Sequence, residues 1–281
     1  MTANLTTAYV AAAMRNRGYS VFEGAPAEVI GGAADSRKVE PGDLFAAFPG
    51  ENVDGNAFVP EALAAGAVAI VCSRMPEGDA PNATVVVAPD VTRAVGELAR
   101  DWRRECGPRV VGITGTVGKT TAKEFTAAVL SQRFRTHFSP GNLNSREGLP
   151  LALMSLRRDH EVSVLELAMD SPGEIAELCA IAEPVVGAVL NIGLTHVSKL
   201  GSIEAIAAEK LSLARALPRT GTAILNIDDP RVAVVASELA CSVITFGEAD
   251  AAILRRGEIT DRGLDGTSFD GTFGETTGRV H

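Results

Sequence analysis

One short stretch of the sequence combines the residue types that bind phosphate. Residues 112–121 read GITGTVGKTT, so that Gly115 and Gly118 precede Lys119 and Thr120. The glycines allow a tight loop whose backbone N–H groups point inward, and the lysine adds a positive charge beside the phosphates. A threonine hydroxyl at this position is a suitable ligand for Mg²⁺. The stretch therefore predicts a site for nucleotide phosphates.

The flanking residues predict the elements that would position this loop. The apolar run Val110–Ile113 is typical of a buried strand, and AKEFTAAVLSQRF has apolar residues at helical spacing. A loop between a strand and a helix places the phosphates at the positive end of the helix. The general motif has glycine at position 113, so this is a shortened variant. The residues that we expect to contact the nucleotide here are Ile113, Thr114, Gly115, Thr116, Val117, Gly118, Lys119, Thr120 and Thr121.

Composition narrows the possible classes of protein. The 281 residues suggest two domains, and 46% apolar with 22% charged residues indicates a core-forming globular chain. A net charge of −9 without any lysine- or arginine-rich block argues against nucleic acid as a partner. No apolar segment is long enough for a membrane span, and no signal peptide is evident. Four widely spaced cysteines read as free thiols, so we expect a cytoplasmic protein.

The first part of the chain reads as a small α/β domain, residues 1–106. We expect helices near 6–17, 57–65 and 91–105, and strands near 43–48, 67–72 and 84–88. The breaker Gly107-Pro108 places the domain boundary near residue 106.

Residues 107–281 repeat a rhythm of strand followed by loop or helix, which favours a mostly parallel sheet. The expected strands are 109–114, 162–167, 185–191, 222–226 and 242–246. A capping box, Ser171-Pro172-Gly173-Glu174, should begin a helix that stops before Pro184, and another helix is expected at 203–217. The tail, 247–281, has a weak hairpin rhythm. The predicted fold class is α/β, with the small N-terminal domain followed by a central P-loop domain.

Polar residues close several of these strands. Glu166 ends the second, Asn191 the third with His196 just beyond, and Asn226 the fourth, followed by Asp228. In an open parallel sheet, ligands bind at the carboxyl ends of the strands. We therefore expect the phosphate loop, Glu166, His196 and Asn226 to converge on one crevice.

Taken together, these segments resemble the Mur ligase family, the ATP-dependent ligases of peptidoglycan precursor synthesis. Four segments carry the resemblance: DSRKVEPGDLFAAFPGENVDGNAFVPEALAAGA, TGTVGKTT, GNLNSREGLPLALMSL with LELAMDSPGEI, and NIGLTHVSKLGSIEAIAAEKLSLARAL with ILNIDDPRV. The shortened phosphate loop is a feature of the family. The third segment is most similar to the member that adds D-alanyl-D-alanine.

The resemblance implies a reaction and its ligands. The carboxylate of UDP-N-acetylmuramoyl-tripeptide would attack ATP to give an acyl phosphate, which the amine of D-alanyl-D-alanine then converts to an amide. It implies catalytic roles for Lys119, Glu166, His196 and Lys210. Two Mg²⁺ ions would be held by Thr120, Glu166, His196 and a carbamate formed on Lys210. Asn226 and Asp228 would contact the nucleotide, and the substrate would contact Ser36, Arg37, Asn142, Asn144 and Ser145. We expect a monomer acting on small molecules.

Some features depart from the family pattern. Val117 stands where a small polar residue is common, and Ala168 and Met169 stand beside Glu166 where glycine and another small residue are usual. Nothing in the sequence corresponds to the family's third domain, so we expect a poorly active chain.

Other readings of the sequence stay open. One is the Mur ligase that adds the third peptide residue, against which the Gly-Asn-x-Asn and Pro-Gly-Glu-Ile segments argue. Another is a P-loop kinase or NTPase, which would not need the DSRKVEPGDLF segment. The last is a non-catalytic module that binds nucleotide or UDP-muramyl peptide.

Overall fold

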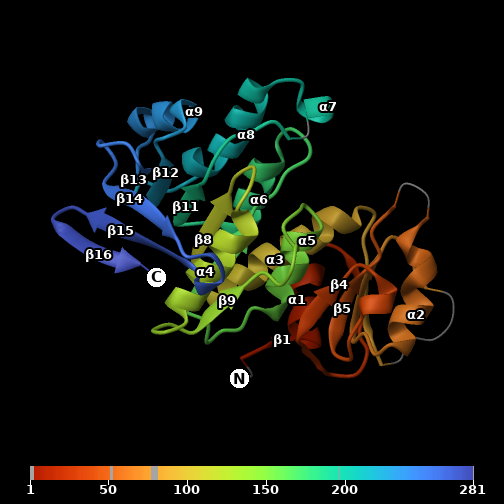
Figure 1. Cartoon of the computed structure of the whole chain (residues 1–281). Helices are drawn as coiled ribbons and strands as arrows, with labels where there is room; N and C mark the ends of the chain where they lie inside the picture. Colours follow the sequence, from red (N-terminus) through yellow and green to blue (C-terminus); the bar gives the residue numbers. More distant parts are fainter. Residues whose placement is uncertain (1–2, 51–52, 77–81, 196, 281) are drawn as a thin grey trace. The chain divides into compact units, whose positions relative to one another are not determined.

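The computed structural model describes residues 3–50, 53–76, 82–195 and 197–280. They form two compact units (Figure 1). The first comprises Met1–Val110, Lys123–Leu167 and Ala180–Ala182, and the second comprises Val111–Ala122, Ala168–Cys179 and Glu183–His281. Strand β8 (Arg109–Thr114) runs from the first unit into the second, and helix α4 (Lys119–Leu130) runs back. The predicted domain boundary near residue 106 stays a prediction.

The first unit contains a five-stranded sheet in the order β2-β7-β6-β5-β4. These strands are β2 (Ser20–Phe22), β4 (Gly31–Ala33), β5 (Asp43–Ala46), β6 (Ala69–Cys72) and β7 (Thr84–Val87). All neighbours are parallel except β2 with β7. Every residue of β5 and β6 is buried, as expected for parallel strands covered on both faces. The predicted strands near 43–48, 67–72 and 84–88 are confirmed.

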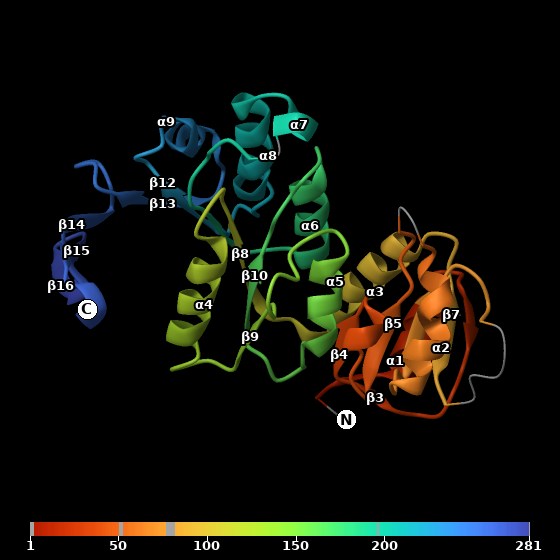
Figure 2. The ribbon, with the colours of Figure 1, turned by 45° about the vertical axis from the view of Figure 1, so that its right-hand side comes forward.

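Three helices cover this sheet: α1 (Thr7–Asn16), α2 (Val59–Ala64) and α3 (Val91–Cys106). Helix α2 lies on the opposite side of the sheet from α3 (Figures 1 and 2). Asp90 caps α3 by accepting from Arg93 N–H, and Gly107 ends it in the left-handed region with φ 66°. The three predicted helices of this region are thus confirmed.

The rest of the first unit is built from short elements. Strands β9 (Thr136–Phe138) and β10 (Val162–Glu166) are a parallel pair, and β1 (Leu5–Thr6) pairs antiparallel with β3 (Glu28–Val29). Helix α5 (Gly148–Ala152) continues into a 3₁₀ turn at Leu153–Ser155. Two more 3₁₀ turns are Ser36–Lys38 and Gly55–Phe58. Because Glu166 is the last residue of β10, its place at a strand end is as predicted.

In the second unit, the strands follow the order β8-β11-β12-β13-β14-β15-β16. Strands β11 (Val186–Val189), β12 (Thr222–Asn226), β13 (Ser242–Gly247) and β14 (Leu254–Asp261) are parallel to their preceding neighbours. Strands β15 (Thr267–Phe273) and β16 (Thr276–Val280) then add antiparallel hairpins, which Figure 2 shows in blue at the C-terminus. The parallel sheet and the hairpin tail are both confirmed.

The helices of the second unit are α6 (Glu174–Ala182, whose last three residues belong to the first unit), α7 (Val197–Leu200), α8 (Ile203–Arg215) and α9 (Pro230–Ala233). The capping box predicted at Ser171 is wrong. Helix α6 begins later, at Glu174, after Gly173 with φ 85° and no side-chain cap of its own. Glu209 of α8 instead accepts the N–H groups of Gly173 and Ile175, both at 2.8 Å, and so supplies the negative charge that a helix start favours.

Candidate functional site

The predicted phosphate loop joins β8 to α4 in the second unit. Strand β8 ends at Thr114 and α4 begins at Lys119, so the intervening residues form a tight turn. Gly118 has φ 81°, a conformation that side-chain-bearing residues rarely adopt. A Cβ on Gly115 would lie 3.0 Å from Leu190 Cβ, so glycine is also needed there for close packing. The sequence prediction of a strand, glycine loop and helix is confirmed.

Two lysines contact consecutive carbonyl groups of this loop. Lys119 Nζ donates to Thr116 O at 3.1 Å, and Lys210 Nζ, from α8, donates to Gly115 O at 3.0 Å. Lys210 is 3% exposed, so burial lowers its pKa to about 8, with a further lowering by the charge of Lys119. The fold thus brings together two of the predicted catalytic residues, which are 91 positions apart in the sequence (210 − 119).

Asn226 and Asp228 are held by backbone groups of the second unit. Asn226 Nδ2 donates to Leu190 O at 2.8 Å, which ties the end of β12 to the residue after β11. The carboxylate of Asp228 accepts N–H groups from Glu248 and Ala249 at 2.8 to 3.0 Å. Both side chains therefore shape turns at the carboxyl ends of strands. Their contact with a nucleotide stays a prediction.

Glu166 lies in the first unit, where it is 2% exposed. Its Oε1 accepts from Asn144 Nδ2 at 2.8 Å, and its backbone N–H donates to Ser139 Oγ at 3.4 Å. Lys123 holds the same segment: its fully buried Nζ donates to Ser139 O at 2.6 Å and to Gly141 O at 3.0 Å. The fold thus joins Glu166 to Asn144. Lys123, which no sequence pattern indicated, holds the turn at Ser139 and Gly141.

The remaining residues that were predicted to contact the substrate differ in their exposure and local contacts. Ser145 Oγ accepts Gly148 N–H at the start of α5, and Asn142 is exposed. Ser36 is buried and donates to Glu61 Oε2 at 2.6 Å, whereas exposed Arg37 forms two hydrogen bonds with the carboxylate of Asp35. The guanidinium of Arg37 lowers the pKa of Asp35 to about 2. Substrate contact by these residues stays a prediction.

His196 lies outside the described residues. The convergence of Glu166, His196 and the phosphate loop therefore also stays a prediction. Thr120, at the exposed start of α4, and Glu166 supply oxygen atoms, the donors that Mg²⁺ prefers. Each of these residues, taken by itself, offers a donor whose chemistry fits the expected metal.

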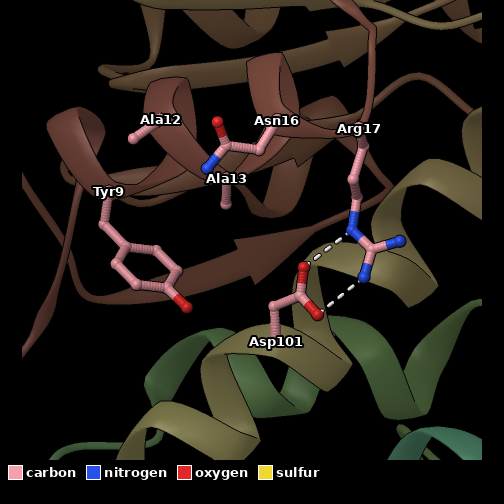
Figure 3. A pocket seen from close by; sticks show the side chains of 6 residues that line it. All are labelled: Tyr9, Ala12, Ala13, Asn16, Arg17 and Asp101. Carbon is pink, nitrogen blue, oxygen red and sulfur yellow. Dashed lines mark hydrogen bonds and ion pairs between the residues drawn. The ribbon is translucent and has the colours of Figure 1, made fainter.

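A pocket of about 500 Å³ in the first unit has a different character (Figure 3). It is lined by residues of α1, by the residue that follows α1 and by one residue of α3: Tyr9, Ala12, Ala13, Asn16, Arg17 and Asp101. Arg17 donates two hydrogen bonds of 2.7 Å to the carboxylate of Asp101, so the pocket's two charges largely neutralise each other. None of these residues was predicted to act, and the pocket has none of the phosphate-binding features of the loop. Within the described ranges, no helix has the length and apolarity to cross a bilayer.

The loop geometry and the parallel sheet define a class, the α/β proteins that bind phosphate between a strand and a helix. Comparison with known proteins then specifies the family. Residues 28–103 match the model described as the Mur ligase family catalytic domain, and residues 113–278 match the Mur ligase middle domain. The chain belongs to the Mur ligase family, and the predicted fold class and resemblance are confirmed.

Individual relatives show which members of the family the chain is similar to. The chain is 42% identical over 195 residues to the UDP-N-acetylmuramoyl-tripeptide–D-alanyl-D-alanine ligase of Synechocystis, covering 69% of this chain and 43% of that protein. Its fold is similar to that of MurF from Acinetobacter baumannii, with a TM-score of 0.84 and 27% identity over 99% of this chain and 60% of that one. MurF from Thermotoga maritima, in complex with ADP, has a TM-score of 0.77 and 29% identity, covering 90% of this chain and 58% of that one. The chain thus spans less than half the length of the Synechocystis relative.

Proposed function

We propose that this chain binds ATP and UDP-N-acetylmuramoyl-tripeptide for the ligation of D-alanyl-D-alanine. The observation that supports this best is that two lysines, Lys119 and Lys210, contact the backbone of a loop whose shape requires glycine. The names of the relatives, and the ADP complex of one of them, supply the substrates. The four cysteines are free thiols, which fits a cytoplasmic location.

The reaction transfers phosphate and then makes an amide. The tripeptide carboxylate attacks the γ-phosphorus of ATP, so that an acyl phosphate forms and ADP leaves. The amine of D-alanyl-D-alanine attacks the acyl carbon, phosphate leaves, and the amine loses a proton. Negative charge accumulates on the phosphoryl oxygens in the first step, where Lys119 would stabilise it. Bound Mg²⁺, held by Thr120, Glu166 and His196, would supply further positive charge at these oxygens.

We further propose that Lys210 carries a carbamate. Its neutral amine adds to CO₂ and loses one proton, which converts a cation into an oxygen ligand for Mg²⁺. This step needs the unprotonated amine, and a pKa of about 8 raises its fraction near neutral pH well above that of an exposed lysine. Isotopically labelled bicarbonate should give a carbamate carbon signal in the wild-type chain and none in Lys210→Ala. Equal signals from both would contradict the assignment.

Two measurements on the 281-residue chain test this function: equilibrium binding of the ligands and release of phosphate from ATP. Calorimetry should detect binding of ADP and of UDP-N-acetylmuramoyl-tripeptide. Phosphate release from ATP should require the tripeptide and should rise with D-alanyl-D-alanine but not with diaminopimelate, a candidate third residue. Failure of both ligands to bind, or hydrolysis that is indifferent to the tripeptide, would contradict the proposal.

A further inference from the structure

Asn191 follows β11 and binds the backbone of the phosphate loop, although from the sequence it was expected only as a polar residue at a strand end. Its Oδ1 accepts the N–H groups of Thr116 and Val117, each at 3.0 Å. Its Nδ2 donates to Val117 O, also at 3.0 Å. Both ends of the amide are therefore used: Oδ1 binds two consecutive loop residues, and Nδ2 binds the second of them.

The residues around Asn191 strengthen this contact. Gly193 N–H donates to Thr116 Oγ1 at 2.8 Å, and the same hydroxyl donates to Gly193 O at 3.3 Å. A Cβ on Gly193 would lie 3.2 Å from Thr116 Cγ2. The segment Asn191–Gly193 thus packs closely against the first half of the loop, and it follows β11, the strand that pairs with β8.

Side chains also bind the carbonyl groups of the loop. Those of Gly115, Thr116 and Val117 each accept a hydrogen bond from a side chain, namely Lys210, Lys119 and Asn191. Asn191 differs from the two lysines because it is neutral and also binds N–H groups. It can therefore hold the loop backbone without being attracted to a bound phosphate as a lysine side chain is.

We propose that Asn191 is a positioning residue that holds the phosphate loop in its binding shape. The N–H groups of Thr116 and Val117 then belong to the scaffold, and the nucleotide phosphates are bound by the backbone from Gly118 onward. A loop that is already ordered loses less conformational entropy when a ligand binds, so the side chain acts on affinity without touching the ligand. The identity of the ligand as a nucleotide rests on the proposed function.

Calorimetric titration with ADP tests the effect on affinity. Asn191→Ala removes all three side-chain bonds and should weaken binding by about tenfold or more, which corresponds to about 1.4 kcal/mol. Asn191→Asp keeps the acceptor but loses the donor to Val117 O and adds a negative charge near the phosphates, so its loss should be larger. Asn16→Ala, an exposed change in α1, serves as the matched control and should bind like wild type. Binding by Asn191→Ala as tight as or tighter than wild type would overturn the proposal.

Amide hydrogen exchange separates this proposal from the proposed function. In wild type without nucleotide, the amides of Thr116 and Val117 should already be protected. Thr116 N–H also donates to the backbone O of Asn191 at 3.1 Å, a contact that Asn191→Ala keeps, so it is the Val117 amide that should exchange at least about tenfold faster in this variant. ADP should slow exchange at Gly118 and Lys119 while changing Thr116 and Val117 little. If ADP does not bind at all, the proposed function fails, but the comparison of free proteins still decides the role of Asn191. Unchanged exchange at Val117 in Asn191→Ala, or in Asn191→Leu should the alanine variant not fold, would overturn that role.

Discussion

Gly118 shows how one residue determines the loop. Its φ of 81° lies in the left-handed region, where any L side chain costs roughly 1–2 kcal/mol. Gly118→Ala should lower the free energy of unfolding by about that amount and should also weaken ADP binding, because the loop must change shape. Gly18→Ala is a matched control, since Gly18 has φ 84° after α1 and no atoms within 4 Å of an added Cβ. It should lose similar stability but keep ADP affinity; equal ADP affinity in the two variants would contradict the account.

At this scale the sequence predicted the local motif but not its partners. Gly115, Gly118 and Lys119 lie within five positions, so their spacing alone indicates phosphate binding. Asn191 reaches Thr116 across 75 positions, and Lys210 reaches Gly115 across 95. Such contacts follow from strand order, which periodicity does not encode. Lys210 was found only through the family resemblance, and no role was predicted for Asn191.

Among the elements, α4 departs at three positions from the usual pattern of an amphipathic helix. Phe125 and Val129 are 70% and 69% exposed, whereas Lys123 is fully buried. The apolar periodicity predicted the helix correctly, but it would have placed Phe125 inside and Lys123 outside. The reason lies in Ser139 and Gly141, whose carbonyl groups need a donor that the Lys123 ammonium provides.

This arrangement predicts a large effect at Lys123. Lys123→Met keeps much of the apolar stem but leaves two carbonyls without their donor, so it should cost about 1–3 kcal/mol in the free energy of unfolding. Because the Ser139–Gly141 turn also contacts Glu166, exchange at the Glu166 amide should rise. Glu124→Gln removes only a half-exposed ion partner of Lys123 and should cost less than about 1 kcal/mol. Urea unfolding compares the three proteins, and equal midpoints for Lys123→Met and wild type would refute the role.

Element length explains which other predictions succeeded. Long periodic segments such as α3 and α8, and the fully apolar strands, were found close to their observed bounds. Strands β4 and β9 have three residues each, and α7 and α9 have four, too few to show a period. The start of α6 was misplaced because its negative partner, Glu209, comes from another helix.

For the molecule as a whole, pH should affect stability through His137. Burial lowers the pKa of this histidine from 6.5 to about 4, and its ring nitrogens bond Ser163 Oγ, Ser155 Oγ and Ala152 O. Because the unfolded chain binds this proton first, the free energy of unfolding should fall as pH drops from 6.5 toward 4. The loss should be about 2 kcal/mol near pH 5, with no contribution from His137 above its unfolded pKa.

Comparison with His137→Gln isolates this effect. The variant cannot take up the proton at position 137. The free energy of unfolding of wild type, relative to that of the variant, should therefore fall by about 2 kcal/mol between neutral pH and pH 5. Denaturant unfolding at the two pH values measures both proteins. A difference that stays constant with pH would show that His137 does not titrate as described.

The central claim is that the turn before α4 binds nucleotide phosphate through Lys119. Calorimetric titration of ADP with Mg²⁺ into wild type, Lys119→Ala and Arg215→Ala tests it most directly. Arg215 is an equal charge in the same unit, exposed at the end of α8 and paired with Glu238. Wild type and Arg215→Ala should bind alike, and Lys119→Ala should bind roughly tenfold to hundredfold more weakly. Equal affinity in all three proteins, or no binding in wild type, would contradict the account.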